Sequence, residues 1–233
     1  MSLLKIPFSL SILWAVKTIV TAPQPPARPT ERVGPIGLEV YLLPPVIKAC
    51  FYLTGLAEIA SILTNHFPEN VISRGILALL VNSSPVDRIQ ITWPFFIAWI
   101  CCLSGAYIRR QCYKALGESF TFEISLRKNH TLVTSGPYAF VRHPSYSSAA
   151  LGLYGAFVCQ TTSGAWLREC SGILQPAWAG WLIGMGWVLA AAIFVVAIVP
   201  RLDKEDRIMK GRFGAEWDQW AMKVPYKLIP MVF

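Results

Sequence analysis

The stretch Ala177–Pro200, AWAGWLIGMGWVLAAAIFVVAIVP, contains no charged side chain over 24 residues. A helix rises about 1.5 Å per residue, so a helix of this length crosses the roughly 30 Å of hydrocarbon in a bilayer. Ile91–Ile108 holds 18 uncharged residues and meets the same requirement. A third uncharged stretch, His143–Leu167, contains glycines and polar residues, and we expect its helix over Tyr146–Thr162. These stretches predict a protein that spans a membrane.

The composition of the whole chain favours the same fold class. Of 233 residues, 54% are hydrophobic and only 15% are charged, which is too few charges to cover a water-soluble protein of this size. We therefore expect an all-α integral membrane protein with about five transmembrane helices. One domain, 1–233, is enough. It comprises N-terminal transmembrane helices over 1–108 and a second half over 109–233 that contains the longest polar interval.

Two apolar segments come before these spans. Pro7–Val20, with Lys17 as its one charge, is either a retained first helix, which we favour, or a cleaved signal peptide. Val46–Leu63 predicts the next span and contains Glu58, whose ionised carboxylate would be costly in hydrocarbon. We expect Glu58 to face the interior of the bundle, a partner or water, in a structural hydrogen bond rather than in a catalytic role. Val71–Val81 is too short to span and predicts an interfacial or re-entrant segment.

The positive charge is concentrated in two parts of the chain. The formal net charge is +8, and of the 21 Lys and Arg residues six lie in Arg109–Arg142 and seven in Arg201–Lys227. Both parts should face the cytosol by the positive-inside tendency, with Arg109 and Arg110 held at the interface. An anionic membrane surface accounts for the basic excess, so the sequence predicts a lipid bilayer as partner and no nucleic acid.

The six cysteines show neither a CxxC pair nor a ligand-like spacing with histidine. We therefore expect reduced thiols that pack as small apolar groups, and no metal site.

The segment Arg201–Met222 alternates charged and bulky apolar residues near helical spacing. It predicts an amphipathic C-terminal helix along the membrane surface, with Trp217 and Trp220 at the depth of the headgroups. If the last transmembrane helix continues into the cytosol, Arg201 and Glu205 share one of its faces, because they are four residues apart.

The polar chemistry is concentrated in HTLVTSGPYAFVRHPSY, residues 130–146, which contains two of the three histidines. The Gly136-Pro137-Tyr138 turn and Arg142-His143-Pro144 predict a rigid, non-helical path, because each proline fixes its own φ and restricts the preceding residue. We expect this path and the Arg201–Glu205 pair to meet at one membrane face.

These residues resemble the isoprenylcysteine carboxyl methyltransferase family. The resemblance rests on HTLVTSGPYAFVRHPSY, on Thr-Phe-Glu at 121–123, and on RLDKED (201–206), FGAEW (213–217) and VPYKLIP (224–230), and it covers about half of the chain. It implies a catalytic half at 109–233 that methylates the C-terminal carboxylate of prenylated cysteine, on proteins or as free prenylcysteine, at the cytosolic face of the membrane. It also implies residence in the endoplasmic reticulum, with several spans and a cytosolic C-terminus.

The resemblance further implies S-adenosyl-L-methionine as cofactor, held in a cytosolic loop. The matching cofactor-binding residues are Glu123, His130, Thr131, Leu132, Val133, Tyr138, His143, Pro144, Ser145, Tyr146 and Glu205. Arg201 stands where the family binds the substrate carboxylate, and Arg201 and Glu205 form the expected catalytic pair. Departures from the family pattern are Glu123 in place of a common glutamine, Ser148 near the His-Pro-x-Tyr group, and Asp206 in place of a second glutamate.

Two other readings remain open from the sequence. A membrane methyltransferase of the same fold could act on a lipid or an apolar small molecule, although a cation at Arg201 is a poor neighbour for an amine acceptor. A membrane scaffold could use the polar loop only to bind a partner. A groove for the prenyl chain, or else plain lipid contact, is expected at Phe95, Phe96, Trp99, Leu153 and Phe157.

Overall fold

The computed structural model describes residues 2–33, 39–127 and 130–233, except the side chains at 2, 39, 177, 187, 190, 191, 193–195 and 197. Within these ranges the chain forms eight α-helices and short 3-10 turns, which confirms the all-α prediction. The helices are α1 (Lys5–Val20), α2 (Glu39–Asn65), α3 (Val71–Leu80), α4 (Trp93–Leu116), α5 (Pro144–Thr161), α6 (Trp166–Glu169), α7 (Ala177–Phe213) and α8 (Ala215–Lys223). Each predicted apolar segment is therefore helical.

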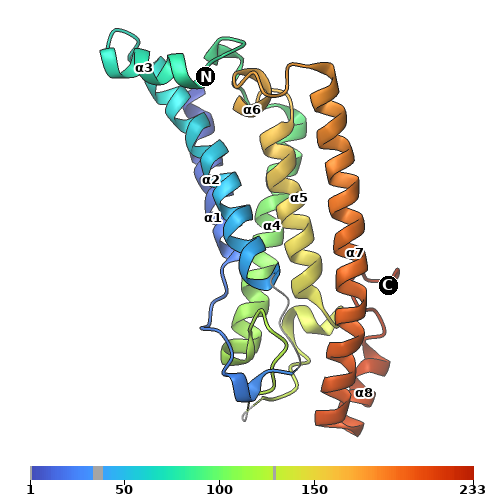
Figure 1. Ribbon diagram of the computed structural model, residues 1–233. Coiled ribbons are helices and arrows are strands. Elements are labelled where there is room, and N and C mark those ends of the chain that lie inside the picture. Colours follow the sequence, from blue (N-terminus) through green and yellow to red (C-terminus); the bar gives the residue numbers. More distant parts are fainter. Residues whose placement is uncertain (1, 34–38, 128–129) are drawn as a thin grey trace.

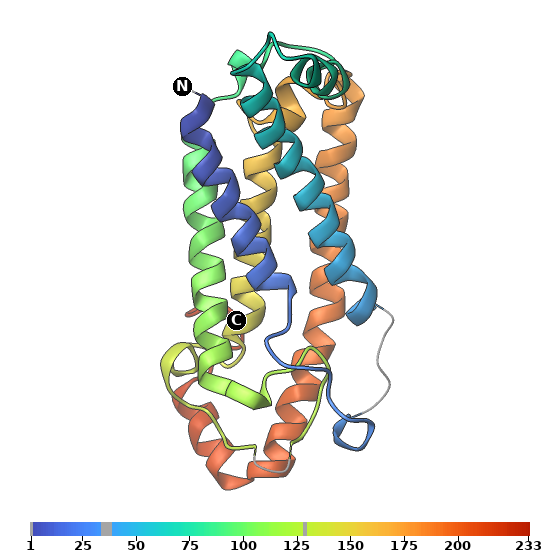
Figure 2. The same cartoon turned by 90° about the vertical axis from the view of Figure 1, so that its left-hand side faces the viewer.

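The five long helices form a bundle in which their axes are roughly parallel or antiparallel (Figure 1). They are α1, α2, α4, α5 and α7. The short helices α3 and α6 lie at one end of the bundle, beside the N-terminus, and α8 lies at the opposite end (Figures 1 and 2). The polar segment that follows α4 also lies at the end that carries α8. The two polar parts of the sequence are therefore brought to the same end of the molecule, which we call the site end.

The core forms where α1, α4 and α5 pack together. Ala15, Val16, Cys102 and Ala156 are fully buried in it. Glycines let the backbones of α4 and α5 touch, since a Cβ at Gly105 would lie 2.4 Å from the backbone N of Gly152. Small residues at such a contact are typical of helices that associate in a membrane.

A buried ion pair ties α1 to α2 at the end remote from α8. Lys5 Nζ lies 2.9 Å from Glu58 Oε2 and donates to the Gly164 carbonyl at 2.7 Å, while Ser9 Oγ donates to Glu58 Oε1 at 2.7 Å. The backbone N–H of Trp166 donates to Glu58 as well. The prediction that Glu58 faces the bundle interior in hydrogen bonds is confirmed, and its partner Lys5 was not predicted.

One helix is long and apolar enough to cross a membrane by length and composition, at residues Val40–Asn65 of α2. This statement holds for the described residues, and several side chains in the apolar stretch of α7 are not among them. The other four predicted spans remain predictions. The start of α2 differs from expectation, because the helix begins at Glu39 and includes Pro44 and Pro45 instead of starting after them.

The C-terminal prediction is wrong in its geometry. Arg201–Phe213 continues α7 without a break, and the turn comes at Gly214, whose φ of +53° is the left-handed region that favours glycine. The separate helix α8 is short, and Trp217 within it is buried. A continuous amphipathic helix on the surface is therefore replaced by an extension of α7 and a folded-back turn.

Several described side chains in the apolar part of α7 face away from the bundle. Trp181, Met185 and Val188 are exposed, and a Cβ at Gly180 or Gly184 would meet no other heavy atom within 4 Å. In the described residues, the side-chain hydrogen bonds of α7 to other segments all lie at the site end.

Candidate functional site

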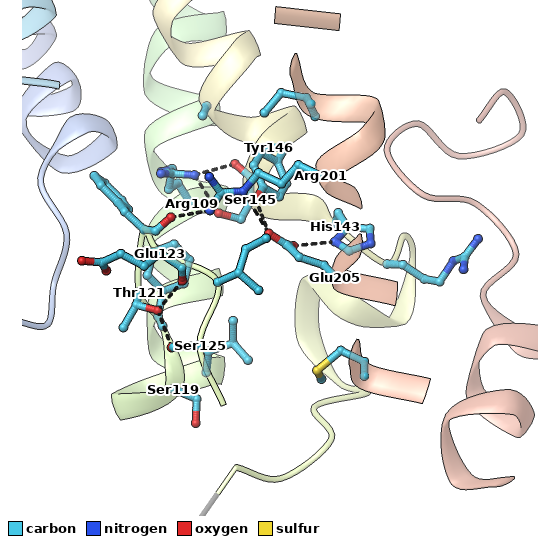
Figure 3. A pocket seen from close by; sticks show the side chains of 18 of the residues that line it. Arg109, Ser119, Thr121, Glu123, Ser125, His143, Ser145, Tyr146, Arg201 and Glu205 are labelled. Atoms are coloured by element: carbon cyan, nitrogen blue, oxygen red, sulfur yellow. Dashed lines mark hydrogen bonds and ion pairs between the residues drawn. The ribbon is translucent and has the colours of Figure 1, made fainter. Parts of the chain in front are cut away.

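A cavity of about 360 Å³ opens at the site end. Its walls come from the start of α2, the end of α4, the loop 119–125, the segment 130–146, the last part of α7, and α8. Figure 3 shows side chains from α4, the loop 119–125, the segment 130–146 and α7 gathered around this cavity. Sequence positions about 60 residues apart therefore meet in one site.

The path through residues 136–146 is built by its glycine and prolines. Gly136 has a φ of +61°, and Pro137 lies in a 3-10 turn, Gly136–Ala139, that buries Tyr138. The predicted Gly136-Pro137-Tyr138 turn is therefore present, as a single 3-10 turn. Pro144 starts α5, where its missing N–H costs no helical hydrogen bond. The preceding backbone is fixed because Arg142 N and His143 N donate to the carbonyls of Tyr226 and Lys227 at 2.9 and 2.8 Å.

Asp206 joins α7 to this path. Its Oδ2 lies 2.7 Å from Arg142 Nη1, and its Oδ1 lies 2.9 Å from His143 Nε2. The side chains of Arg142 and Asp206 are both 12% exposed, so solvent screens their attraction little. Arg142 also donates to the Pro225 carbonyl at 3.0 Å and thereby connects the C-terminal segment to the cluster.

Glu205 is the centre of a second set of polar contacts (Figure 3). Tyr146 donates its hydroxyl to Glu205 Oε1 at 2.5 Å, Arg201 Nε donates to the same oxygen at 3.1 Å, and His143 Nδ1 lies 3.4 Å from Oε2. The guanidinium carbon of Arg201 lies 5.8 Å from the centre of the Tyr146 ring, and its Nη2 donates to the Phe122 carbonyl. The predicted shared face of Arg201 and Glu205 is thus present.

These contacts set the charges of the cluster. Burial alone would raise the pKa of Glu205, but the hydrogen bond and charge of His143 and the charge of Arg201 hold that pKa below its ordinary value. Burial alone would lower the pKa of His143, but its hydrogen bonds to Asp206 and Glu205 raise that pKa above its ordinary value. An ionised Glu205 beside a protonated His143 is the arrangement that these shifts favour.

Glu123 lies on the opposite wall, on the loop after α4. It is 7% exposed, and Tyr41 donates its hydroxyl to Glu123 Oε1 at 3.3 Å. No cation lies within ion-pair distance of Glu123 in the described residues. Thr121 stabilises the loop by donating to the Glu123 carbonyl at 2.7 Å. This carboxylate is therefore available to a positively charged group in the cavity.

The far part of the cavity, toward α8, contains buried polar atoms without a protein partner. Both ring nitrogens of His130 and the indole nitrogens of Trp217 and Trp220 are buried and unpaired in the described structure. Burial, and then the charge of Arg212, lower the pKa of His130, which favours a neutral ring. Buried polar groups are nearly always hydrogen-bonded in native proteins, so these four atoms fit a ligand that brings its own donors and acceptors.

Most of the predicted site residues line this cavity. They are Glu123, His130, Leu132, Val133, Tyr138, His143, Ser145, Tyr146, Arg201 and Glu205. Thr131 is exposed and Pro144 is buried at the start of α5, and neither is among the lining residues. Of the five positions suggested for a prenyl groove, Leu153 lines the cavity, while Phe95 is buried in the core and Trp99 binds Ser11 Oγ through its indole N–H at 2.8 Å.

For three residues that line the cavity, the sequence analysis predicted a position at the membrane interface instead. Trp217 and Trp220, expected among lipid headgroups, face the cavity. Arg109, expected at the interface together with Arg110, is buried in the cavity wall, whereas Arg110 is exposed. In the sequence, the four-residue spacing of Arg109 and Tyr113 was the available signal for a shared inward face.

Comparison with known proteins gives one family. The model of the isoprenylcysteine carboxyl methyltransferase family matches residues 98–164, which include most of α4, the 130–146 segment and α5. The chain is 29% identical over 133 residues to a protein-S-isoprenylcysteine O-methyltransferase of Dictyostelium discoideum, covering 52% of this chain and 50% of that protein. It is 42% identical over 62 residues to the protein of the same name from Xenopus laevis, covering 26% and 22%.

A shorter similarity has a higher identity. Over 32 residues the chain is 62% identical to the cobalt-zinc-cadmium resistance protein CzcN of Cupriavidus metallidurans, covering 14% of this chain and 15% of that protein. The chain thus covers at most half the length of these relatives. The resemblance drawn from the sequence motifs is confirmed.

Proposed function

We propose that this chain, which belongs to the isoprenylcysteine carboxyl methyltransferase family, transfers a methyl group from S-adenosyl-L-methionine to the C-terminal carboxylate of a prenylated cysteine. The observation that carries the proposal is the single cavity shared by the Arg201–Glu205 face of α7 and the 130–146 segment. The family is one of methyltransferases, and its motif residues lie around this cavity.

The residues of the cavity fit the proposed cofactor. When bound, S-adenosylmethionine supplies a methyl group on a positively charged sulfur. The ionised Glu205, and Glu123, which has no cationic partner among the described residues, offer acceptor oxygens to its cationic groups. Tyr138 and Tyr146 can place an aromatic face beside a cation. The unpaired nitrogens of His130, Trp217 and Trp220 fit the polar edges of a nucleoside.

The acceptor needs no strong base in this reaction. A carboxylic acid is already ionised at neutral pH, so catalysis depends on alignment of two reactants in a site that excludes water. Arg201 is fixed by Glu205 and by the Phe122 carbonyl, and it is the group that we propose to orient the acceptor carboxylate. Planar guanidinium groups suit this task, because their N–H fork matches a carboxylate.

The location of the cavity suits a lipidated acceptor. Its wall includes the apolar side chains of Leu43 and Ile47 on α2, Leu153 on α5 and Ile198 on α7. The helix α2 is the one described helix that is apolar enough to cross a membrane. A prenyl chain could therefore remain among apolar side chains while its carboxylate reaches the polar cluster, and we place this event at the cytosolic face of the membrane.

The test is a methyl-transfer assay with the purified full chain in detergent. We expect transfer of labelled methyl from S-adenosylmethionine to N-acetyl-S-farnesylcysteine. Arg201→Ala should lower turnover by about 100-fold or more while calorimetry still detects cofactor binding. Arg207→Ala, which removes an exposed arginine of the same helix, is the control and should keep wild-type turnover.

Three outcomes would contradict the proposal at different levels. Cofactor binding without transfer to any prenylcysteine would exclude the proposed acceptor. Transfer to a lipid or an apolar small molecule would instead support a methyltransferase with another acceptor. Absence of any heat of cofactor binding would favour a membrane scaffold without enzymatic activity.

A further inference from the structure

Arg109 is a buried cation without an acidic partner in the cavity wall. It is 8% exposed and belongs to α4. Its Nε donates to the Ile19 carbonyl at 3.0 Å and to the Tyr113 hydroxyl at 2.9 Å, and its Nη1 donates to the carbonyl and hydroxyl of Ser145 at 2.8 and 2.7 Å. All of these acceptors are neutral. Among the described residues no carboxylate lies within ion-pair distance of Arg109.

The other two arginines that line the cavity differ in this respect. Arg142 is paired with Asp206, and Arg201 is paired with Glu205. Burial of a charge is unfavourable unless an opposite charge or a full set of hydrogen bonds compensates it. Among the described arginines that line the cavity, Arg109 is therefore the one whose positive charge has no anionic partner.

Aromatic rings hold the Arg109 guanidinium in place. Its central carbon lies 5.4, 5.6 and 5.5 Å from the ring centres of Tyr113, Phe120 and Phe122. Such rings attract a cation, but they cannot accept the in-plane hydrogen bonds of a guanidinium. The described structure gives no partner to Nη2, and this atom is not among the fully enclosed unpaired atoms. A fixed guanidinium thus keeps one N–H edge for a ligand.

We infer that Arg109 binds the carboxylate of a ligand in this cavity. The inference rests on the proposed function, in which two reactants carry a carboxylate: the amino-acid end of the cofactor, and the acceptor prenylcysteine. Either one would supply the missing anion, and Arg109 then adds a binding residue to those that the sequence motifs gave. Arg109 is close to the polar cluster, since Ser145, which it binds, directly precedes Tyr146 (Figure 3).

The experiment compares each ligand with a form that lacks its carboxylate. Calorimetry in detergent measures S-adenosylmethionine against decarboxylated S-adenosylmethionine, and N-acetyl-S-farnesylcysteine against its methyl ester. For one pair, the wild-type chain should bind the carboxylate form about tenfold or more tightly. In Arg109→Gln this preference should fall to near unity for the cofactor pair, or several-fold for the acceptor pair, because Arg201 still binds the acceptor carboxylate. The affinity for the carboxylate-free form should stay within about twofold.

Arg110→Gln, the exposed neighbour, is the matched control and should keep the wild-type preference. If Arg109→Gln does not fold, Arg109→Lys keeps the charge without the planar fork, and it should lower the preference several-fold. The ligand pair that responds identifies the source of the carboxylate. An unchanged preference for both pairs overturns the inference alone, whereas a wild-type chain that binds neither ligand overturns the proposed function together with it.

Discussion

His143 lies between two carboxylates and binds both. Its Nδ1 is 3.4 Å from Glu205 and its Nε2 is 2.9 Å from Asp206. Both carboxylates belong to α7, whereas His143 immediately precedes α5. The imidazole of His143 therefore connects α7 to the start of α5, and this contact is stronger when the imidazole is protonated.

This contact predicts a pH dependence of stability. Burial alone would lower the pKa of His143, but the hydrogen bonds to Asp206 and Glu205 raise it in the folded protein. The resulting stabilisation is complete below the ordinary pKa of about 6.5, and it is lost as the pH rises through the raised pKa. Glu205 has the opposite sign: its pKa is lowered, so its contribution is present above its ordinary value and is lost as the pH falls through the lowered one. We expect the melting temperature in detergent to fall as the pH rises above about 6.5.

The comparison uses two histidine variants. His143→Gln should show a flatter melting temperature over this pH range, because the titrating group has been removed. His66→Gln changes an exposed histidine and should retain the wild-type slope. Equal slopes in wild type and His143→Gln would contradict the assignment.

Asp206 provides a prediction about stability. Asp206→Asn removes the charge that binds Arg142 and His143 in a part of the site that is only 12% exposed, and we expect a loss of about 2–3 kcal/mol in unfolding free energy. Asp203→Asn is the matched change, since Asp203 contacts Lys227 with a side chain that is 49% exposed, and it should cost much less than Asp206→Asn. Denaturant titration in detergent measures both, and similar losses would argue against a structural role for Asp206.

For single residues, the sequence predicted which side chains contact each other better than it predicted which way each side chain points. The four-residue spacing of Arg201 and Glu205 predicted their contact, because helical geometry fixes which residues share a face. It did not predict that Arg109 points inward and Arg110 outward, since neighbouring residues differ by about 100° around a helix and charge alone does not select the face. Trp217 and Trp220 were misplaced for a related reason: indoles suit both a headgroup layer and a ligand cavity.

At the scale of helices, the contact between α4 and α5 predicts a sharp effect of one methyl group. Gly105→Ala would place a Cβ 2.4 Å from the backbone N of Gly152, and backbone cannot move aside as a flexible side chain can. We expect a loss of about 1–3 kcal/mol, as for overpacked cores. Gly75→Ala in α3 is the control, because its Cβ meets nothing within 4 Å. Thermal unfolding of both variants is the measurement, and a neutral Gly105→Ala would refute the close contact.

The helix α1 is the subject of a second prediction at this scale. Lys5→Met leaves Glu58 buried at 3% exposure without its cation, which should cost about 3–5 kcal/mol. Replacing both residues, Lys5→Met with Glu58→Leu, should recover much of that loss. Lys17→Met, at an exposed position of the same helix, should change little. A double variant no more stable than the single one would show that the pair itself is not the cause.

These contacts bear on the choice between a retained helix and a cleaved signal peptide. Arg109 and Tyr113 bind carbonyls of Thr18 and Ile19 at one end of α1, and Glu58 binds Lys5 at the other. Removal of α1 would leave the buried carboxylate of Glu58 without its cation and would take the Ile19 carbonyl from Arg109, so we expect the mature protein to retain it. The intact mass of the purified protein measures this directly, and a mass that lacks α1 would exclude it.

Helices were predictable from apolar runs, but their limits were not. A run of apolar residues gives a helix wherever backbone groups must pair internally, and all such segments are helical here. The start of α2 was misplaced because prolines usually stand near a helix start, whereas Pro44 and Pro45 lie inside it. The break at Gly214 was missed because charged and apolar residues keep helical spacing on both sides of it, so the pattern does not reveal the turn.

For the whole molecule, the positions of the two ends predict a topology. The N-terminus lies at the end opposite to the polar site, and α8 lies at the site end (Figure 1). With basic residues concentrated around the site, we expect that end in the cytosol. A cysteine introduced at Lys210 should react with an impermeant reagent from the cytosolic side, and one at Glu69, beside α3, only from the other side. The reverse pattern would invert the orientation.

The hydrogen bonds that join α7 to other segments lie at the site end, and this limits how the protein can change during evolution. In the described structure its side-chain hydrogen bonds to other segments come from Arg201 and Glu205, which we propose to handle the reactants, and from Asp203 and Asp206. Arg201 and Glu205 thus both hold α7 in place and contribute to the proposed site. A drift toward a new acceptor would loosen the longest helix unless another part of the chain changed with it, so innovation at this end should proceed through coordinated rather than single replacements.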